Sequence, residues 1–151
     1  MAANRISIYP SDAIYRLLDA LPGASVSGRI NQAAHYFMTI MEAEIPAIQW
    51  TKAQWCAVMG ALEDADTAAA IADSPDWQLA WASVADKPEL DAQWGVNHEQ
   101  LAAEMRAMSV TRKLALYEAA ARFWARAELL TDDEALDAAG IKPIDAPAGE
   151  T

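Results

Sequence analysis

Cysteine and long apolar runs are scarce in this sequence. Its 151 residues include one cysteine, Cys56, so no disulfide can form within the chain. This excludes a small secreted fold held by disulfides and favours a reducing compartment. No stretch reaches the roughly 18 uninterrupted apolar residues of a membrane span, and the first ten residues lack the long apolar segment of a signal peptide. We therefore expect a cytoplasmic protein that does not engage a membrane.

Catalytic and metal-binding motifs are lacking as well. The two histidines, His35 and His98, lie 63 positions apart, without the short spacing of metal ligands. The sequence contains no Gly-rich phosphate loop, no His-Glu-x-x-His and no Gly-x-Ser-x-Gly. Cys56 follows Trp55 in an apolar helical segment, which favours a buried thiol over a nucleophile. The sequence thus predicts a protein that is not an enzyme and that uses neither a cofactor nor a metal.

Positively charged residues are also scarce in this sequence. Eleven Lys and Arg stand against 22 Asp and Glu, which gives a net charge of −11. Because phosphates attract Lys and Arg, this balance argues against nucleic acid as a ligand. The charge is uneven along the chain: −1 over residues 1–45, −8 over 46–105, +3 over 106–130 and −5 over 131–151. Most of the negative charge therefore lies outside the N-terminal segment.

Apolar residues, in contrast, are abundant. They make up 54% of the chain and include six Trp, so a folded core is expected. Residues 5–9 alternate polar and apolar side chains, as a strand with one buried face does. Apolar residues at helical spacing follow Ser11, and Pro22-Gly23 separates them from a second helical pattern that runs to Pro46.

The remainder of the chain predicts further helices, each with its own start signal. Thr51, Asn97, Ser109 or Thr111, and Thr131 precede apolar residues at helical spacing, and Gly140 ends the last pattern. The apolar stripes are expected at Trp55, Val58, Met59 and Leu62, at Leu101, Met105 and Met108, and at Leu114, Tyr117, Ala121 and Trp124. The predicted organisation is a module over 1–45, an acidic Trp-rich helical domain over 47–140 and a flexible tail over 141–151.

The segment RISIYPSDAIYRLLDAL, followed by GASVSGRINQAAHYF, resembles the ribbon-helix-helix family of small bacterial repressors. The resemblance covers residues 4–45 and rests on the alternating strand, Pro10, a capped first helix and a turn with Gly23, Ser25 and Ser27. It implies a homodimer in which two chains pair their strands and interlock their helices. The residues that it places in the shared core are Ile6, Ile8, Leu17, Leu18, Ile30, Ala34 and Phe37.

The same resemblance implies that the paired strands enter the major groove of double-stranded DNA. It places Arg5, Ser7 and Tyr9 at the base edges. Backbone N–H groups near Ser25, Val26 and Ser27, at the start of the second helix, would bind a phosphate, and Arg29 just inside that helix would add a phosphate contact. The alternative is that the ribbon builds the dimer and contacts nothing else.

The helical segment beyond residue 47 is too long to be a mere tail. Trp residues on helical stripes are expected in its core, whereas Trp50 and Trp94 fall near predicted helix ends and are candidates for a partner surface. The acidic segment 63–104 is either a solvated exterior or a surface for a basic partner.

Taken together, these patterns predict a mainly α protein, in which an N-terminal ribbon-helix-helix dimerisation module precedes an all-α helical bundle. The leading functional hypothesis is a sequence-specific DNA-binding homodimer that acts as a transcriptional repressor or autoregulator, with a helical domain for a partner or effector. The alternative is an acidic protein-interaction module, such as an antitoxin, an inhibitor or a nucleic-acid mimic, which uses the ribbon only to dimerise.

Overall fold

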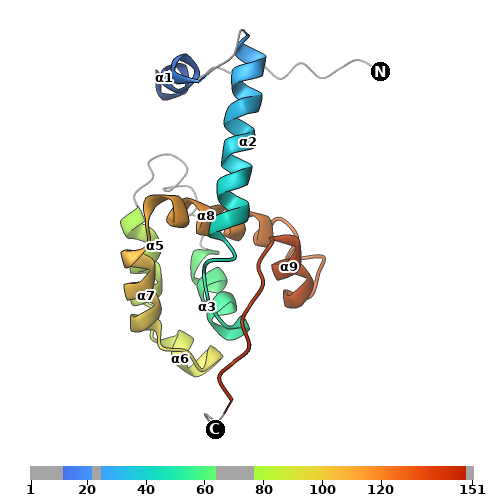
Figure 1. Ribbon diagram of the computed structural model, residues 1–151. Helices are drawn as coiled ribbons and strands as arrows, with labels where there is room; N and C mark the ends of the chain where they lie inside the picture. The colour runs from blue at the N-terminus through green and yellow to red at the C-terminus, as the bar shows by residue number, and fades with distance from the viewer. Residues whose placement is uncertain (1–11, 22–24, 64–76, 149–151) are drawn as a thin grey trace. The chain divides into compact units, whose positions relative to one another are not determined.

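The computed structural model describes residues 12–21, 25–63 and 77–148. Its helices are α1 (Asp12–Ala20), α2 (Val26–Glu44), α3 (Lys52–Leu62), α5 (Trp77–Ala85), α6 (Glu89–Trp94), α7 (His98–Ala107), α8 (Val110–Trp124) and α9 (Asp132–Ala138) (Figure 1). The chain divides into two compact units, residues 1–39 (unit 1) and residues 40–151 (unit 2). Helix α2 therefore begins in unit 1 and ends in unit 2.

The predicted fold class is wrong in its N-terminal part. The described residues are mainly helical and contain no β-strand, and their one β contact is an isolated bridge between Thr51 and Ile144. The ribbon was expected at residues 5–9, which lie outside the described residues. A five-residue strand finds no partner for its backbone groups within its own length, so alternation of side chains alone does not establish a sheet. The part of the chain that the structure describes is therefore mainly α and holds no ribbon module.

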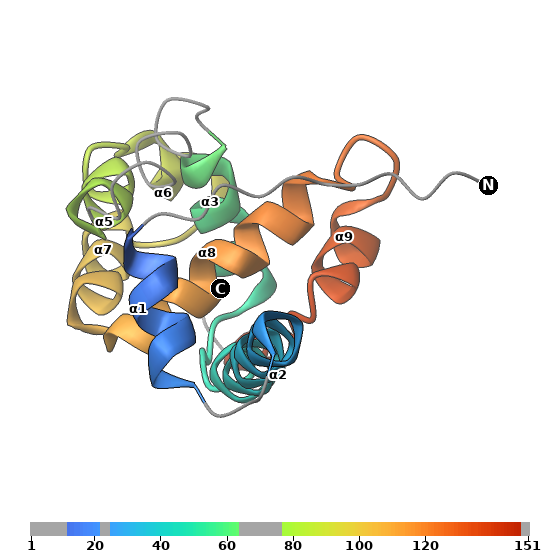
Figure 2. The same cartoon turned by 90° about the horizontal axis from the view of Figure 1, so that it is seen from above.

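Helix α3 is the centre of unit 2. A helix that is apolar on all sides must be covered on all sides, and α5, α6 and α8 pack against it. Figure 1 shows α8 crossing above α3, with α5, α6 and α7 on one side of α3 and α9 on the other, and Figure 2 shows α8 running past α3 toward α9. The buried residues of α3 are Trp55, Cys56, Ala57, Val58, Met59, Ala61 and Leu62.

Helix α8 buries a different face from the one that its apolar spacing predicts. Leu114 and Ala121 were expected inside but are exposed, and Trp124 is half-buried. Alanines dominate the buried face, and their small side chains let α8 approach its neighbours closely. The buried residues of α8 are Ala115, Leu116, Ala119, Ala120 and Phe123.

The helix starts predicted at Thr51, Asn97, Ser109 and Thr131 are confirmed. Thr51 and Thr131 each form a capping box, and the side chains of Asn97 and Ser109 each accept a hydrogen bond from the backbone N–H three residues further on. Gly140 has a φ of 77°, the left-handed conformation that follows many helices. Each cap bond links residues three apart, so the local sequence is sufficient to predict it.

Trp50 connects the start of α3 to two distant segments. Its indole N–H donates to Glu104 Oε2 of α7 at 2.7 Å, and its carbonyl oxygen accepts the N–H of Ile144 at 2.9 Å. Ile141 is buried too, so residues 141–144 belong to the packed part of unit 2. None of the helices in the described residues combines the length and the apolar character that a bilayer crossing requires.

The carboxylate of Asp91 anchors the start of α7. It accepts the backbone N–H of His98 at 2.7 Å and lies 2.9 Å from the ring Nδ1 of His98. The backbone hydrogen bond, helped by the ring, lowers the pKa of Asp91 below its usual value near 3.8. Folding therefore stabilises the ionised carboxylate. This stabilisation is fully present above the unfolded-state pKa and is lost as the pH falls through the folded-state pKa.

We expect the stability difference between the wild type and Asp91→Asn to depend on pH. The difference should be largest near neutral pH, where the carboxylate is ionised in both states, and it should shrink as the pH falls below about 4. Urea unfolding of both proteins at about pH 6 and about pH 3 measures it. A difference of equal size at the two pH values would contradict the role given to the Asp91 carboxylate.

Candidate functional site

Some of the residues predicted for DNA contact and dimerisation lie outside the described residues, and the others lie in or next to α1 and α2. Arg5, Ile6, Ser7, Ile8 and Tyr9 lie outside the described residues. Leu17 and Leu18 belong to α1. The others lie immediately before α2 or along it: Ser25, Val26, Ser27, Arg29, Ile30, Ala34 and Phe37.

The predicted phosphate site at the start of α2 is partly used by the protein itself. The backbone N–H of Gly28 donates to Ser25 Oγ at 3.0 Å, so Ser25 acts as a cap. The guanidinium of Arg29 lies 4.0 Å from the carboxylate of Asp19 in α1. Val26 and Ser27 are exposed. The nearest cation at this helix start is therefore shared with a carboxylate.

An apolar stripe follows the part of α2 that belongs to unit 1. We call it the α2 stripe and define it by Val26, Ile30, Ala33 and Phe37, which repeat at intervals of four, three and four residues and so share one helix face. Val26 is 61% exposed, Ile30 43% and Phe37 39%. Rows of exposed large apolar side chains mark surfaces that contact another molecule.

The two Trp residues proposed for a partner surface occupy different environments. Trp50 is 3% exposed and belongs to the core, where its ring meets Trp55 edge-on with the centroids 5.0 Å apart. Trp94 at the end of α6 is half-buried and lines a cavity of about 380 Å³ in unit 2. Trp50 is thus buried in the core, whereas Trp94 lines a cavity that a ligand could enter.

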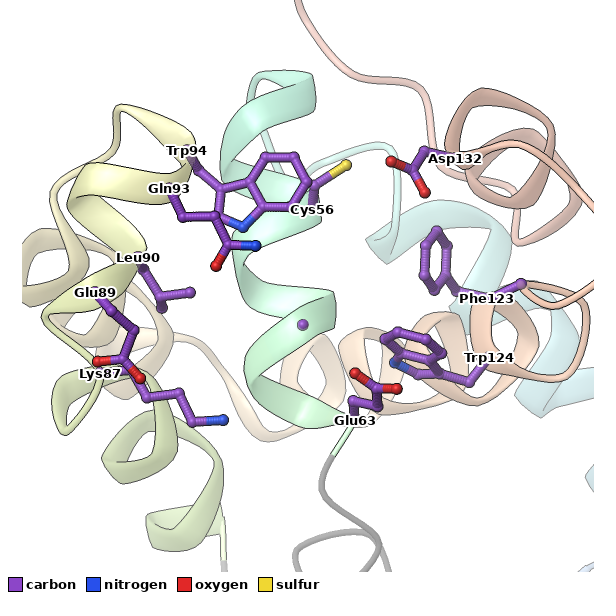
Figure 3. Close-up of a pocket in the computed structure, with 12 residues that line it drawn as sticks. Cys56, Glu63, Lys87, Glu89, Leu90, Gln93, Trp94, Phe123, Trp124 and Asp132 are labelled. Atoms are coloured by element: carbon purple, nitrogen blue, oxygen red, sulfur yellow. The ribbon is translucent and has the colours of Figure 1, made fainter.

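This cavity, which we call the α3 pocket, lies between α3, α6 and α8 (Figure 3). Cys56 and Gly60 of α3 line one side, Trp94 comes from α6 and Trp124 from α8. Figure 3 shows the side chains of Trp94, Trp124 and Leu90 projecting into the space between the helices. The pocket is thus lined by aromatic side chains from α6 and α8 and by residues of the core helix α3.

The charged side chains of the α3 pocket are mostly acidic. Glu63, Glu89 and Asp132 stand against Lys87, which gives the lining a net charge of −2. Lys87 Nζ donates to the carbonyl oxygen of Ala61 at 3.4 Å. Within the described part of the chain, none of the three carboxylates forms an ion pair. The pocket therefore suits a cation better than an anion.

Cys56 contributes a neutral thiol to the α3 pocket. Burial raises the pKa of this thiol, and the negative charge of Asp132 raises it further. A thiol in this state is a weak nucleophile, which agrees with the buried, unreactive cysteine expected from its position beside Trp55. The residues that the structure describes also hold no group of three His, Cys, Asp or Glu placed to bind a metal ion.

No family model, curated protein or solved structure matches this chain. The α2 stripe and the α3 pocket are therefore the features on which a functional conclusion can rest.

Gly60 and Glu63 are among the residues of the α3 pocket that sequence reasoning missed. Gly60 lies inside α3, and a Cβ atom built on it would meet nothing within 4 Å, so no close packing requires a glycine there. Glu63 is the C-cap of α3, where the negative end of the helix dipole disfavours a carboxylate. A glycine inside an apolar helical run and an acid at its end were the signals that could have found them.

Replacement of Gly60 by Ala should stabilise the protein by about 0.5–1 kcal/mol, because alanine is the better helix former and its methyl group enters open space. Urea unfolding measures the change. The same replacement at Gly95 is the matched control: a Cβ there also meets nothing within 4 Å, but φ is +65°. Gly95→Ala should therefore destabilise by on the order of 1 kcal/mol. Destabilisation by Gly60→Ala would show that the pocket floor tolerates no side chain.

Proposed function

We propose that this protein is an acidic protein-interaction module that self-associates through unit 1 and presents unit 2 to a basic protein partner. The observation that carries the proposal is the α2 stripe, whose large apolar side chains stay exposed in the described part of the chain. Its spacing of four and three residues is the one by which helices pack along one another. Antitoxins, inhibitors and nucleic-acid mimics are kinds of protein that combine these features.

The two units differ in net charge, and each therefore favours a different binding partner. Residues 1–39 hold three Arg and two Asp, a net charge of +1, whereas residues 40–151 hold eight Lys and Arg against twenty Asp and Glu, a net charge of −12. Two copies repel each other through unit 2 and approach without repulsion through unit 1. A second copy of this chain therefore fits the α2 stripe, and a two-fold axis would place the same stripe on both sides of the contact. A basic surface is the complement of unit 2.

The proposal places this module in the cytoplasm. Cys56 is the one cysteine of the chain, and it is buried and unbonded. A protein whose stability uses no disulfide suits a reducing compartment.

We expect the wild type to sediment as a dimer and the double variant Ile30→Glu/Phe37→Glu as a monomer. The added carboxylates would bring like charges into an apolar contact that uses the same residues on both copies. Analytical ultracentrifugation over a range of concentrations measures the change, and circular dichroism checks that the helices persist.

Leu129→Glu is the matched control, because Leu129 is 86% exposed and lies in unit 2, outside the α2 stripe. This variant should remain a dimer. A wild type that is monomeric throughout the concentration range, or a double variant that stays dimeric, would refute self-association through the stripe.

DNA binding by unit 1 is the second candidate function, and the charge separation is the observation that favours it. The resemblance to ribbon-helix-helix repressors implies a transcriptional repressor or autoregulator, and unit 1 is free of the excess negative charge of unit 2. This candidate concerns α1 and α2 and involves no ribbon. Arg16 and Arg29 are the cations that these helices offer to phosphates.

Fluorescence anisotropy with promoter DNA of the protein's own gene tests this second function. We expect binding in about 50 mM salt that weakens by about tenfold or more in 200 mM salt, because phosphate contacts release counterions. Arg16→Ala/Arg29→Ala should remove the binding, and Arg126→Ala in unit 2 should not change it. If no complex forms at low salt, DNA binding is excluded.

A further inference from the structure

Two residues at the C-terminal end of α3 have low preference for their positions, Gly60 in the last turn and Glu63 at the C-cap. Gly60 weakens the helix interior, although the space around it would admit a side chain. Glu63 places a negative charge at the negative end of the helix dipole. Both line the α3 pocket. Departures from local preference of this kind are expected at functional sites and are offset by interactions elsewhere in the protein.

The other charged residues of the pocket have a role in the fold. Glu89 and Asp132 lie in the first turns of α6 and α9, where acids stabilise the positive end of a helix. Lys87 donates to a carbonyl oxygen at the end of α3. Glu63 is therefore the carboxylate that the helix ends do not account for.

Aromatic side chains are the second feature of the pocket that favours a cation, beside its carboxylates. Trp124 is held in place, since its indole N–H donates to the carbonyl oxygen of Met59 at 3.0 Å and its ring meets Phe123 edge-on at 5.1 Å. Indole rings attract organic cations, and arginine most often. Unit 2 already contains one such contact, with the guanidinium of Arg106 5.3 Å from the centre of a Trp81 ring.

We propose that the α3 pocket binds an arginine side chain from the basic partner. A planar guanidinium can stack on an indole and donate hydrogen bonds to a carboxylate at the same time. Trp94 and Trp124 offer the rings, Glu63 offers the carboxylate, and the absent side chain at Gly60 leaves the room. This inference rests on the part of the proposed function that assigns a basic partner to unit 2, and it does not depend on self-association.

The test titrates the full-length protein with the peptide Ac-Gly-Arg-Gly-NH2 and follows the indole N–H signals of Trp94 and Trp124 by NMR. Trp94→Phe and Trp124→Phe assign the two signals. The control peptide carries citrulline, which keeps the shape of arginine without its charge. We expect the arginine peptide to shift both signals and to bind about fivefold or more tightly than the citrulline peptide. Equal binding of the two peptides, or no shift with either, would overturn the proposal.

Variants of the pocket sharpen this test. Glu63→Gln should weaken the arginine peptide by about two- to fivefold, whereas Glu128→Gln, outside the pocket, should leave its affinity unchanged. Gly60→Leu should abolish peptide binding, because its side chain would occupy the pocket. Gly60→Ala should raise Tm by about 2–4 °C and still weaken the peptide. Wild-type affinity in Glu63→Gln would remove this carboxylate from the site, and with it the proposal.

Two further measurements separate this inference from its rivals. The variant Ile30→Glu/Phe37→Glu should bind the peptide with wild-type affinity, so a failure of self-association leaves this result intact. N-propylguanidine, which carries the single charge of an arginine side chain, should bind no more tightly than the peptide. Clearly tighter binding of N-propylguanidine would reassign the pocket to a small molecule and overturn its role in recognising a protein.

Discussion

Unit 2 depends on one requirement: α3 has to be kept from water on every side. Its residues are apolar around the whole circumference, so α5, α6 and α8 are drawn against it by the hydrophobic effect. At its N-terminal end, the capping box of Thr51 and the two hydrogen bonds of Trp50 satisfy the backbone and bring in α7 and residues 141–144. Near the C-terminal end of α3, the helices that cover it do not pack completely against it, and the α3 pocket remains between them.

The two units differ in the burial of their apolar side chains and in their net charge. Unit 2 has a large buried core, although Val110 and Leu129 stay exposed, and it carries all of the excess negative charge, which repels other copies. Unit 1 is almost neutral and leaves the α2 stripe exposed. These differences support the division of labour that we propose, in which one unit meets a second copy of the chain and the other meets a basic partner.

Local signals in the sequence predicted the helix starts well and the packing poorly. The cap of Asn97 was predictable because its side chain bonds to Gln100, three residues away. The buried face of α8 was not, because Leu114 suggested one face and the alanines that contact the core lie on another. The strand expected at residues 5–9 lies outside the described residues, and the described residues contain no strand that could pair with it; alternation of side chains predicts a strand only where a partner supplies the missing hydrogen bonds. Of the pocket, Trp94 was noticed from the sequence and Gly60 was not.

The sequence by itself determined the mainly helical character of the described residues between 47 and 140, the starts of helices such as α3 and α7, the acidic charge and the absence of a disulfide within the chain. These properties depend on composition or on contacts between residues three or four positions apart. The tertiary structure alone decided that α3 is buried all round, that Trp50 lies inside while Trp94 faces a cavity, and that Gly60, Glu89 and Asp132 line the same cavity. Such placements depend on which helix faces come into contact across the chain, and no local spacing encodes them.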